Sequence, residues 1–178
     1  MTASNVITDF GFSPLGLSER SISEQGQRLA NMVLTAGKDV PLQDVQAIVE
    51  LMSGAKRLSA TFRFRPGYTD LNAPSKAVAE LLAKNLILGN YADKIMVFVG
   101  FSDSSGTARA NKNLSQKRAE AVRQAVIAAA PQGSLSEVSF EVAGYGEASP
   151  LVCEDEDGGA EVNRRVEVWI QDRVPAAE

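Results

Sequence analysis

The residues best placed for chemistry are a carboxylate and a guanidinium that stand near each other in the sequence. Asp103 lies in a Ser/Gly-rich loop directly after an apolar run, and Arg118 lies in the amphipathic segment that follows. A fixed anion and a fixed cation a few ångströms apart can recognise a zwitterion. Arg118 would donate two parallel hydrogen bonds to the carboxylate of such a ligand, and Asp103 would accept from its ammonium. Backbone N–H groups of residues 104–106 would add donors for the carboxylate.

A purely structural interpretation of the same pair is also open. Asp103 and Arg118 would then form an ion pair that only ties the loop to the helix. Exposed pairs of that kind contribute about 0–1 kcal/mol to folding. The residue types alone do not decide between a ligand site and an ion pair.

The remaining residue types argue against catalysis. The chain has no histidine, which excludes His-dependent triads, His metal sites and His proton relays. Its one cysteine, Cys153, cannot form an internal disulfide or a multi-cysteine zinc site, and is interpreted as a loop residue. The acidic run 154–157 lacks the ligand spacing and distal Glu of an EF-hand loop, so a solvated, mobile loop is expected there. We therefore expect no catalytic residue, no metal and no cofactor.

Composition and charge narrow the function classes further. With 178 residues, 44% of them hydrophobic and 22% charged, the chain is long enough for a core without disulfides or metals. A net charge of −4 and a pI of about 5.0 argue against broad nucleic-acid binding, which needs a basic surface. No run of about 18 apolar residues is present, so no transmembrane segment is predicted. Residues 1–4 lack the basic and apolar regions of a signal peptide.

Hydrophobic periodicity predicts the elements that must position Asp103 and Arg118. Alternation of apolar and polar residues indicates strands. The nearly all-apolar run 95–99 is typical of a central strand that is covered on both faces. Apolar residues at helical spacing indicate two helices. The order is β-α-β-α-β-β, an α/β (α+β) sandwich with two helices on one mixed sheet. Strands are predicted over 59–64, 95–99, 138–142 and 166–170, and helices from 70–74 to Gly89 and from Leu114 to the stop at 131–133, with Trp169 packed on the sheet.

The N-terminal region shows a different pattern, without recognisable chemistry. Two short helices are predicted, over 23–35 and 41–52, each followed by a glycine. We therefore interpret residues 1–57 as a helical N-terminal extension, which would be the tail of a larger upstream domain. Residues 58–173 would form the main domain, and 174–178 a disordered tail.

Three segments occur in the order and spacing of a known family. They are Gly100-Phe101-Ser102-Asp103, the run from Asn111 through Leu114-Ser115 to Arg118-Ala119, and Asn163-Arg164-Arg165-Val166-Glu167. The family pattern is roughly G-H-T-D, a short Gly/Asn loop, N-x-x-L-S-x-x-R-A and N-R-R-V-E. The chain thus resembles the OmpA-like (OmpA/MotB C-terminal) peptidoglycan-binding domains over residues 58–173, and the resemblance implies the same fold.

The resemblance implies a ligand for the candidate pair. In the family, the residues at the positions of Asp103 and Arg118 hold diaminopimelate, which carries a free ammonium and a free carboxylate on one carbon of the peptidoglycan stem peptide. Asn111 matches the family asparagine, and its alternative role is a helix cap or a turn hydrogen bond.

Several neighbouring positions bear on the same pocket. Arg164 and Arg165 alternate across the start of a strand, so only one can face the pocket. Arg164 is expected there by its family position, and Arg165 is expected to pair with surface acids. At the pocket rim, Phe101 replaces the family histidine, Ser102 replaces threonine, and Arg65 replaces an acid or amide. These departures imply a lower affinity or a different anionic ligand.

The function implied by the resemblance is non-catalytic. The domain would bind peptidoglycan and anchor a cell-envelope protein in the periplasm. The full-length protein would be linked to the outer membrane. An upstream domain or a homodimer would complete it. The chain would then be a fragment of a longer protein. An alternative is a degenerate OmpA-like interaction domain of a larger periplasmic protein, such as a solute-binding fusion, with weak or no affinity for peptidoglycan. An enzyme acting on the same polymer is disfavoured, because the chain offers little to activate a nucleophile or bind zinc.

Overall fold

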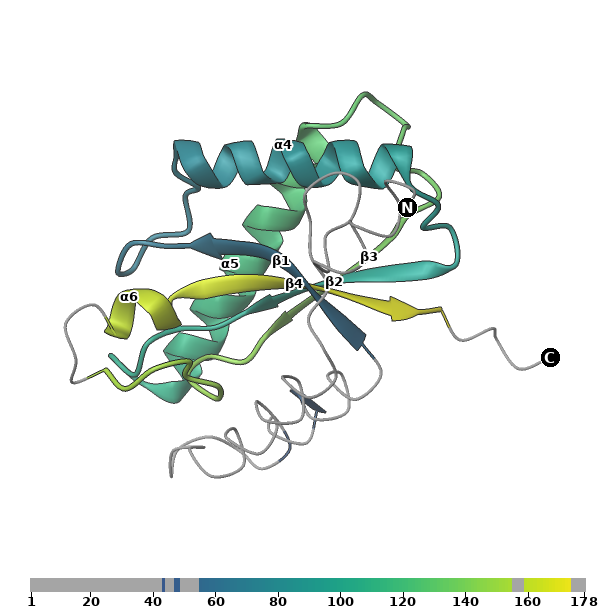
Figure 1. Cartoon of the computed structure of the whole chain (residues 1–178). Coiled ribbons are helices and arrows are strands. Elements are labelled where there is room, and N and C mark those ends of the chain that lie inside the picture. The colour runs from purple at the N-terminus through teal and green to yellow at the C-terminus, as the bar shows by residue number, and fades with distance from the viewer. Residues whose placement is uncertain (1–42, 44–46, 49–54, 155–158, 174–178) are drawn as a thin grey trace, which may run out of the picture.

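A mixed four-stranded sheet organises the part of the chain that the computed structural model describes, which is residues 43, 47–48, 55–154 and 159–173 (Figure 1). The strand order is β1-β4-β2-β3, with β2 and β3 parallel and β4 antiparallel to both β1 and β2. This arrangement confirms the predicted mixed sheet. The strands are β1 (Ala55–Arg63), β2 (Lys94–Gly100), β3 (Ser139–Gly144) and β4 (Arg165–Asp172).

The two predicted long helices are present as α4 (Ala73–Leu88) and α5 (Ala108–Ala128). Asn72 caps the start of α4 by accepting a hydrogen bond from the Ser75 N–H, as its residue type favours. Thr107 caps α5 in the same way. Helix α5 therefore begins about a turn and a half before Leu114, where the apolar residues that predicted the helix begin. A third helix, α6 (Gly159–Asn163), lies just before β4 (Figure 1) and was not predicted. It is too short to show an apolar period.

Apolar side chains form one core on each face of the sheet. The larger core lies between the sheet and helices α4 and α5, and includes Phe62, Leu82, Phe98 and Val122. The smaller core lies against the side chains of Val97, Val99 and Trp169, which alternate with the first set along β2 and β4. Trp169 is fully buried and packs on the sheet as predicted.

The smaller core contains two residues from the predicted N-terminal extension, Ile48 and Ala55. Gln43, Ala47 and Ile48 are helical, and Ile48 is fully buried with Ala55 and Trp169. The rest of the two predicted N-terminal helices lies outside the described residues, so the proposed domain limits remain predictions. Among the described residues, no helix combines the length and the apolarity needed to cross a bilayer.

Two glycines allow α5 to lie directly on the ends of β2 and β3. Gly100 and Gly144 are partners in the parallel register. A Cβ atom at Gly100 would stand 2.0 Å from the backbone oxygen of Ser115, and one at Gly144 would stand 2.3 Å from the backbone nitrogen of Gln116. Both distances are far inside van der Waals contact, so only glycine permits this approach. The contact fixes the turn of α5 that precedes Arg118.

Replacing Ile48 by alanine tests whether the N-terminal residues belong to the folded core. Removing a fully buried isoleucine side chain is expected to lower the free energy of unfolding by about 2–5 kcal/mol. Urea unfolding of the full chain measures this change. The exposed Gln43 provides the control, since Gln43→Ala should change stability by no more than about 0.5 kcal/mol. Equal stabilities of the two variants would contradict the observed packing of Ile48.

Candidate functional site

The predicted site residues meet where the loop after β2 lies against the chain segment that enters β4. Asp103 Oδ2 accepts a hydrogen bond from Arg164 Nη1 at 2.8 Å, and both side chains are nearly buried. Arg164 also donates through Nε to the backbone oxygen of Phe64 at 3.1 Å. The structure therefore brings Asp103 and Arg164 together as an ion pair. The alternative in which Asp103 pairs with Arg118 is wrong, because Arg118 makes its hydrogen bonds elsewhere.

Arg118 is fully buried and is held by backbone carbonyls. Its Nε donates to the oxygen of Tyr68 and its Nη2 to the oxygen of Arg65, both at 3.0 Å. The guanidinium carbon lies 5.2 Å from the centre of the Phe64 ring. The third nitrogen, Nη1, is buried and has no hydrogen-bond partner among the described residues. Nη1 of this cation is thus left without an acceptor by the described residues.

Burial lowers the pKa of Arg118 to about 10, and the like charge of Arg164 acts in the same direction, while Asp103 partly offsets both. Arg118 remains protonated at neutral pH. A ligand carboxylate beside it would favour the charged form.

Asp103 is held in its charged form by the groups around it. Its Oδ1 accepts hydrogen bonds from the backbone N–H and the hydroxyl of Ser105, in addition to the contact between Oδ2 and Arg164. Burial alone would raise the pKa of Asp103, but the hydrogen bonds from Ser105 and Arg164 and the charge of Arg164 outweigh it and leave the pKa below its usual value. A carboxylate offers about four lone-pair sites, so Asp103 can still accept from a ligand.

Asn111 and Ser102, the other two predicted site residues, lie in the same place. Asn111 is buried, and its Nδ2 donates to the backbone oxygen of Asp103 and to the carboxylate of Glu147. It therefore braces the loop that carries Asp103. The hydroxyl of Ser102 is buried and, like Nη1 of Arg118, has no hydrogen-bond partner among the described residues.

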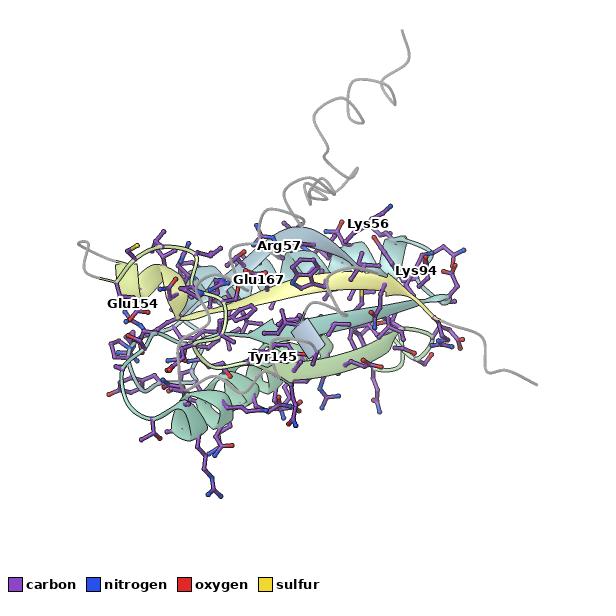
Figure 2. The ribbon with its side chains drawn as sticks, turned by 90° about the horizontal axis from the view of Figure 1, so that it is seen from below. Lys56, Arg57, Lys94, Tyr145, Glu154 and Glu167 are labelled. Atoms are coloured by element: carbon purple, nitrogen blue, oxygen red, sulfur yellow. The ribbon has the colours of Figure 1, made fainter. Side chains whose placement is uncertain are left out.

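Glu154 is a residue of this region whose role the sequence did not reveal. Its carboxylate accepts from the backbone N–H and the hydroxyl of Ser104, and from Nδ2 of Asn163 at 2.9 Å. Glu154 thus joins the Asp103 loop to the segment that carries Arg164, at the end of the molecule where α6 lies (Figure 2). Residue 154 was expected in a solvated, mobile loop; the structure places it in a turn, partly exposed, with its carboxylate hydrogen-bonded to Ser104 and Asn163, and residues 155–158 lie outside the described part. The N–H of Ser104, expected to face the ligand, is occupied by Glu154.

Arg165 has a different surrounding from the one expected. It is fully buried, donates to Glu167 at 2.7 Å and to the backbone oxygen of Ser149 at 2.9 Å, and its guanidinium carbon lies 4.1 Å from the centre of the Phe101 ring. Arg57 lies 3.2 Å from the same buried carboxylate (Figure 2). The expectation of a surface ion pair for Arg165 is therefore wrong. Phe101 belongs to the smaller core rather than to the rim of the site.

The described residues do not suggest a metal centre. They include no cluster of three or more acidic or cysteine side chains arranged to hold an ion. Cys153 is exposed and forms no disulfide. The chemistry on offer is the binding of charged groups by Arg118, Asp103 and Arg164.

Comparison with known proteins gives the same fold. The OmpA family model matches residues 63–164, more than half of the chain. Outer membrane porin F of Pseudomonas fluorescens is 31% identical over 90 residues, which is 49% of this chain and 26% of the porin. The chain thus spans about a quarter of the length of this relative.

Solved structures agree with the family match. The peptidoglycan-associated lipoprotein of Burkholderia pseudomallei superposes with a TM-score of 0.51 at 22% identity, covering 62% of this chain and 89% of the lipoprotein. The periplasmic domain of Helicobacter pylori MotB (residues 90–256) gives 0.53 at 18% identity, covering 69% and 77% of the two chains. The cell wall anchor of the T6SS from Pseudomonas aeruginosa gives 0.50 at 20% identity, covering 82% and 97%. At these identities the likeness concerns the fold.

The depressed pKa of Asp103 makes its contribution to folding depend on pH. A carboxyl group whose folded pKa lies below its unfolded value stabilises the folded state above the unfolded pKa of about 4, and loses that contribution as the pH falls through the folded pKa. Wild-type protein should therefore be more stable than Asp103→Asn at pH 7, and the difference should shrink below about pH 4. Urea unfolding at several pH values measures it. A difference that does not change with pH would contradict the role of charge.

Proposed function

The chain belongs to the OmpA family, and on that premise we propose that it binds peptidoglycan, without catalysis, through the diaminopimelate of the stem peptide. One observation carries the proposal. Ser102 Oγ and Arg118 Nη1 are the buried side-chain polar atoms without a hydrogen-bond partner in the described part of the chain, and both belong to predicted site residues. Leaving a buried donor unpaired costs about 1–3 kcal/mol, and more for a charged group. A ligand carboxylate at Nη1 would remove that penalty.

The charged groups around Nη1 of Arg118 would favour a zwitterion that is oriented with its carboxylate toward Arg118. Of the groups proposed to contact the ligand, Arg118 and Arg164 carry two positive charges and Asp103 carries one negative charge, whereas the carboxylates of Glu147 and Glu154 accept from Asn111 and Ser104. The carboxylate of the ligand would bind Arg118 in a charge-assisted hydrogen bond. The ammonium on the same carbon would then lie toward Asp103, which retains acceptor capacity and is ionised at neutral pH.

Binding of this kind would anchor a protein of the cell envelope, on the periplasmic side, to the cell wall. The relatives support that setting, since they include an outer membrane porin, a peptidoglycan-associated lipoprotein and a cell wall anchor. An upstream domain, a homodimer and an outer-membrane link are proposals for the whole protein, of which the chain need be only a part.

A degenerate domain with weak or no affinity for peptidoglycan is the second candidate, and Glu154 favours it. The carboxylate of Glu154 accepts hydrogen bonds from the N–H and hydroxyl of Ser104, and Arg164 donates to one oxygen of Asp103. The chain thereby satisfies some of the groups that a ligand would otherwise engage. In that case the domain would serve as an interaction module of a larger periplasmic protein.

Replacing Arg118 by glutamine separates the two candidates. Loss of a hydrogen bond from a charged donor corresponds to about 1.5–3 kcal/mol, so the affinity for diaminopimelate-containing peptidoglycan should fall about 10- to 150-fold. Co-sedimentation of folded protein with insoluble peptidoglycan measures this, with folding checked by a melting curve. Arg123 on the same helix pairs with Glu120 instead and provides the control, since Arg123→Gln should sediment like wild type.

The other outcomes are also decisive. Equal sedimentation of wild type, Arg118→Gln and Arg123→Gln would show that binding does not use Arg118. Failure of the wild-type protein to sediment would favour the degenerate domain. Release of soluble fragments from the peptidoglycan would contradict a non-catalytic function.

A further inference from the structure

A rigid turn beside Arg118 carries an arginine that the site does not yet use. The N–H of Tyr68 donates to the oxygen of Arg65 at 3.2 Å, which closes a four-residue turn. Pro66 occupies the second position, and Gly67 occupies the third with a φ of +72°. This is the combination that a type II turn requires. The turn therefore holds Arg65 and Tyr68 in a fixed relation.

The side chains at the two ends of the turn lie against each other. The guanidinium carbon of Arg65 is 4.4 Å from the centre of the Tyr68 ring. A cation over an aromatic face at this distance is attracted by the negative charge density of the ring face. Both residues are exposed, Tyr68 by 51%. The ring thus orients the Arg65 guanidinium while leaving it accessible to solvent.

The turn is also part of the wall of the candidate site. Arg118 donates to the backbone oxygens of both Arg65 and Tyr68 at 3.0 Å, so the buried cation and the turn are held as one unit. A ligand carboxylate at Nη1 of Arg118 would lie beside this turn. Arg65 is then the next cation that an extended ligand would meet.

The charge of Arg65 is not neutralised within the described part of the chain. Arg164 pairs with Asp103, and Arg165 and Arg57 pair with Glu167. Among the described residues, Arg65 contacts the Tyr68 ring and forms no ion pair with a carboxylate. An unpaired cation beside a second, buried cation favours an anion that the ligand supplies.

We propose that Arg65 binds a second carboxylate of the stem peptide, so that the site prefers ligands carrying one more carboxylate than the zwitterion itself. This inference rests on the proposed function. Two groups of the ligand have the required chemistry. One is the free α-carboxylate of the γ-linked glutamate that precedes diaminopimelate. The other is the second carboxylate of diaminopimelate, which is free only where the stem peptide ends at that residue.

Calorimetric titration of the full chain with three soluble muropeptides tests the inference. The reference ligand is a tripeptide stem with glutamate, which carries both extra carboxylates. The second ligand has isoglutamine in place of glutamate, and the third has a terminal alanine amide, which blocks the diaminopimelate carboxylate without adding another. Arg65→Ala should weaken binding of the reference ligand about 1.4- to fivefold, the range for an exposed ion pair. Lys84→Ala, which removes an exposed charge on α4, should bind like wild type.

The two modified ligands identify the source of the second carboxylate. If the glutamate supplies it, the effect of Arg65→Ala vanishes with the isoglutamine ligand and persists with the blocked ligand. If diaminopimelate supplies it, the pattern is reversed. If Arg65→Ala binds all three ligands as tightly as the wild type does, the inference is overturned. The same holds if the variant loses affinity for all three ligands by the same factor. The effect should also shrink at high salt, since the pair is exposed.

Failure of this inference is distinguishable from failure of the proposed function. Arg118→Gln should lose affinity for all three ligands. If it does while Arg65→Ala behaves like wild type, only the role of Arg65 is overturned. If wild-type protein binds none of the ligands, both proposals are overturned.

Discussion

The burial of the Arg118 guanidinium is the constraint on which the site depends. Burying a charge costs free energy unless its donors are satisfied, and two of the three nitrogens of Arg118 are satisfied by the carbonyls of Tyr68 and Arg65. These contacts require α5 to lie close to the sheet and the turn 65–68 to lie close to α5. Gly100 and Gly144 permit the first approach, and Pro66 and Gly67 shape the turn. The remaining nitrogen is thereby held in place before any ligand binds.

Strand alternation gives the two adjacent arginines at the start of β4 separate roles. Arg164 lies on the side of the Asp103 loop and forms the ion pair of the site. Arg165 lies against the smaller core, where Glu167, Phe101 and the oxygen of Ser149 surround it. One segment of the chain thus supplies a charge to the site and a second charge to the interior. The contacts of Arg165 with Glu167, Phe101 and the oxygen of Ser149 hold the chain next to the loop that carries Asp103.

The sequence was sufficient to predict the strands and long helices, because apolar periodicity reflects burial directly. It also led to the prediction that Asp103, Arg118, Asn111, Arg164 and Ser102 are site residues; the structure places these residues in one region, and their role in ligand binding stays a prediction. It did not identify the partner of Asp103, because Arg164 is distant in sequence and only the sheet order brings the two together. Glu154 was missed for the same reason. The burial of Arg165 had a local signal in the Arg-x-Glu spacing, since residues two apart on a strand share a face.

Nuclear magnetic resonance of the arginine side chains during titration with a diaminopimelate-containing muropeptide tests the central claim most directly. The claim is that Nη1 of Arg118 is the donor that binds the ligand carboxylate. We expect the guanidinium signals of Arg118 to shift with ligand concentration and its Nη1 protons to exchange more slowly with solvent, while the signals of the remote Arg123 stay unchanged. Ligand binding that leaves the Arg118 signals unaltered would contradict the claim.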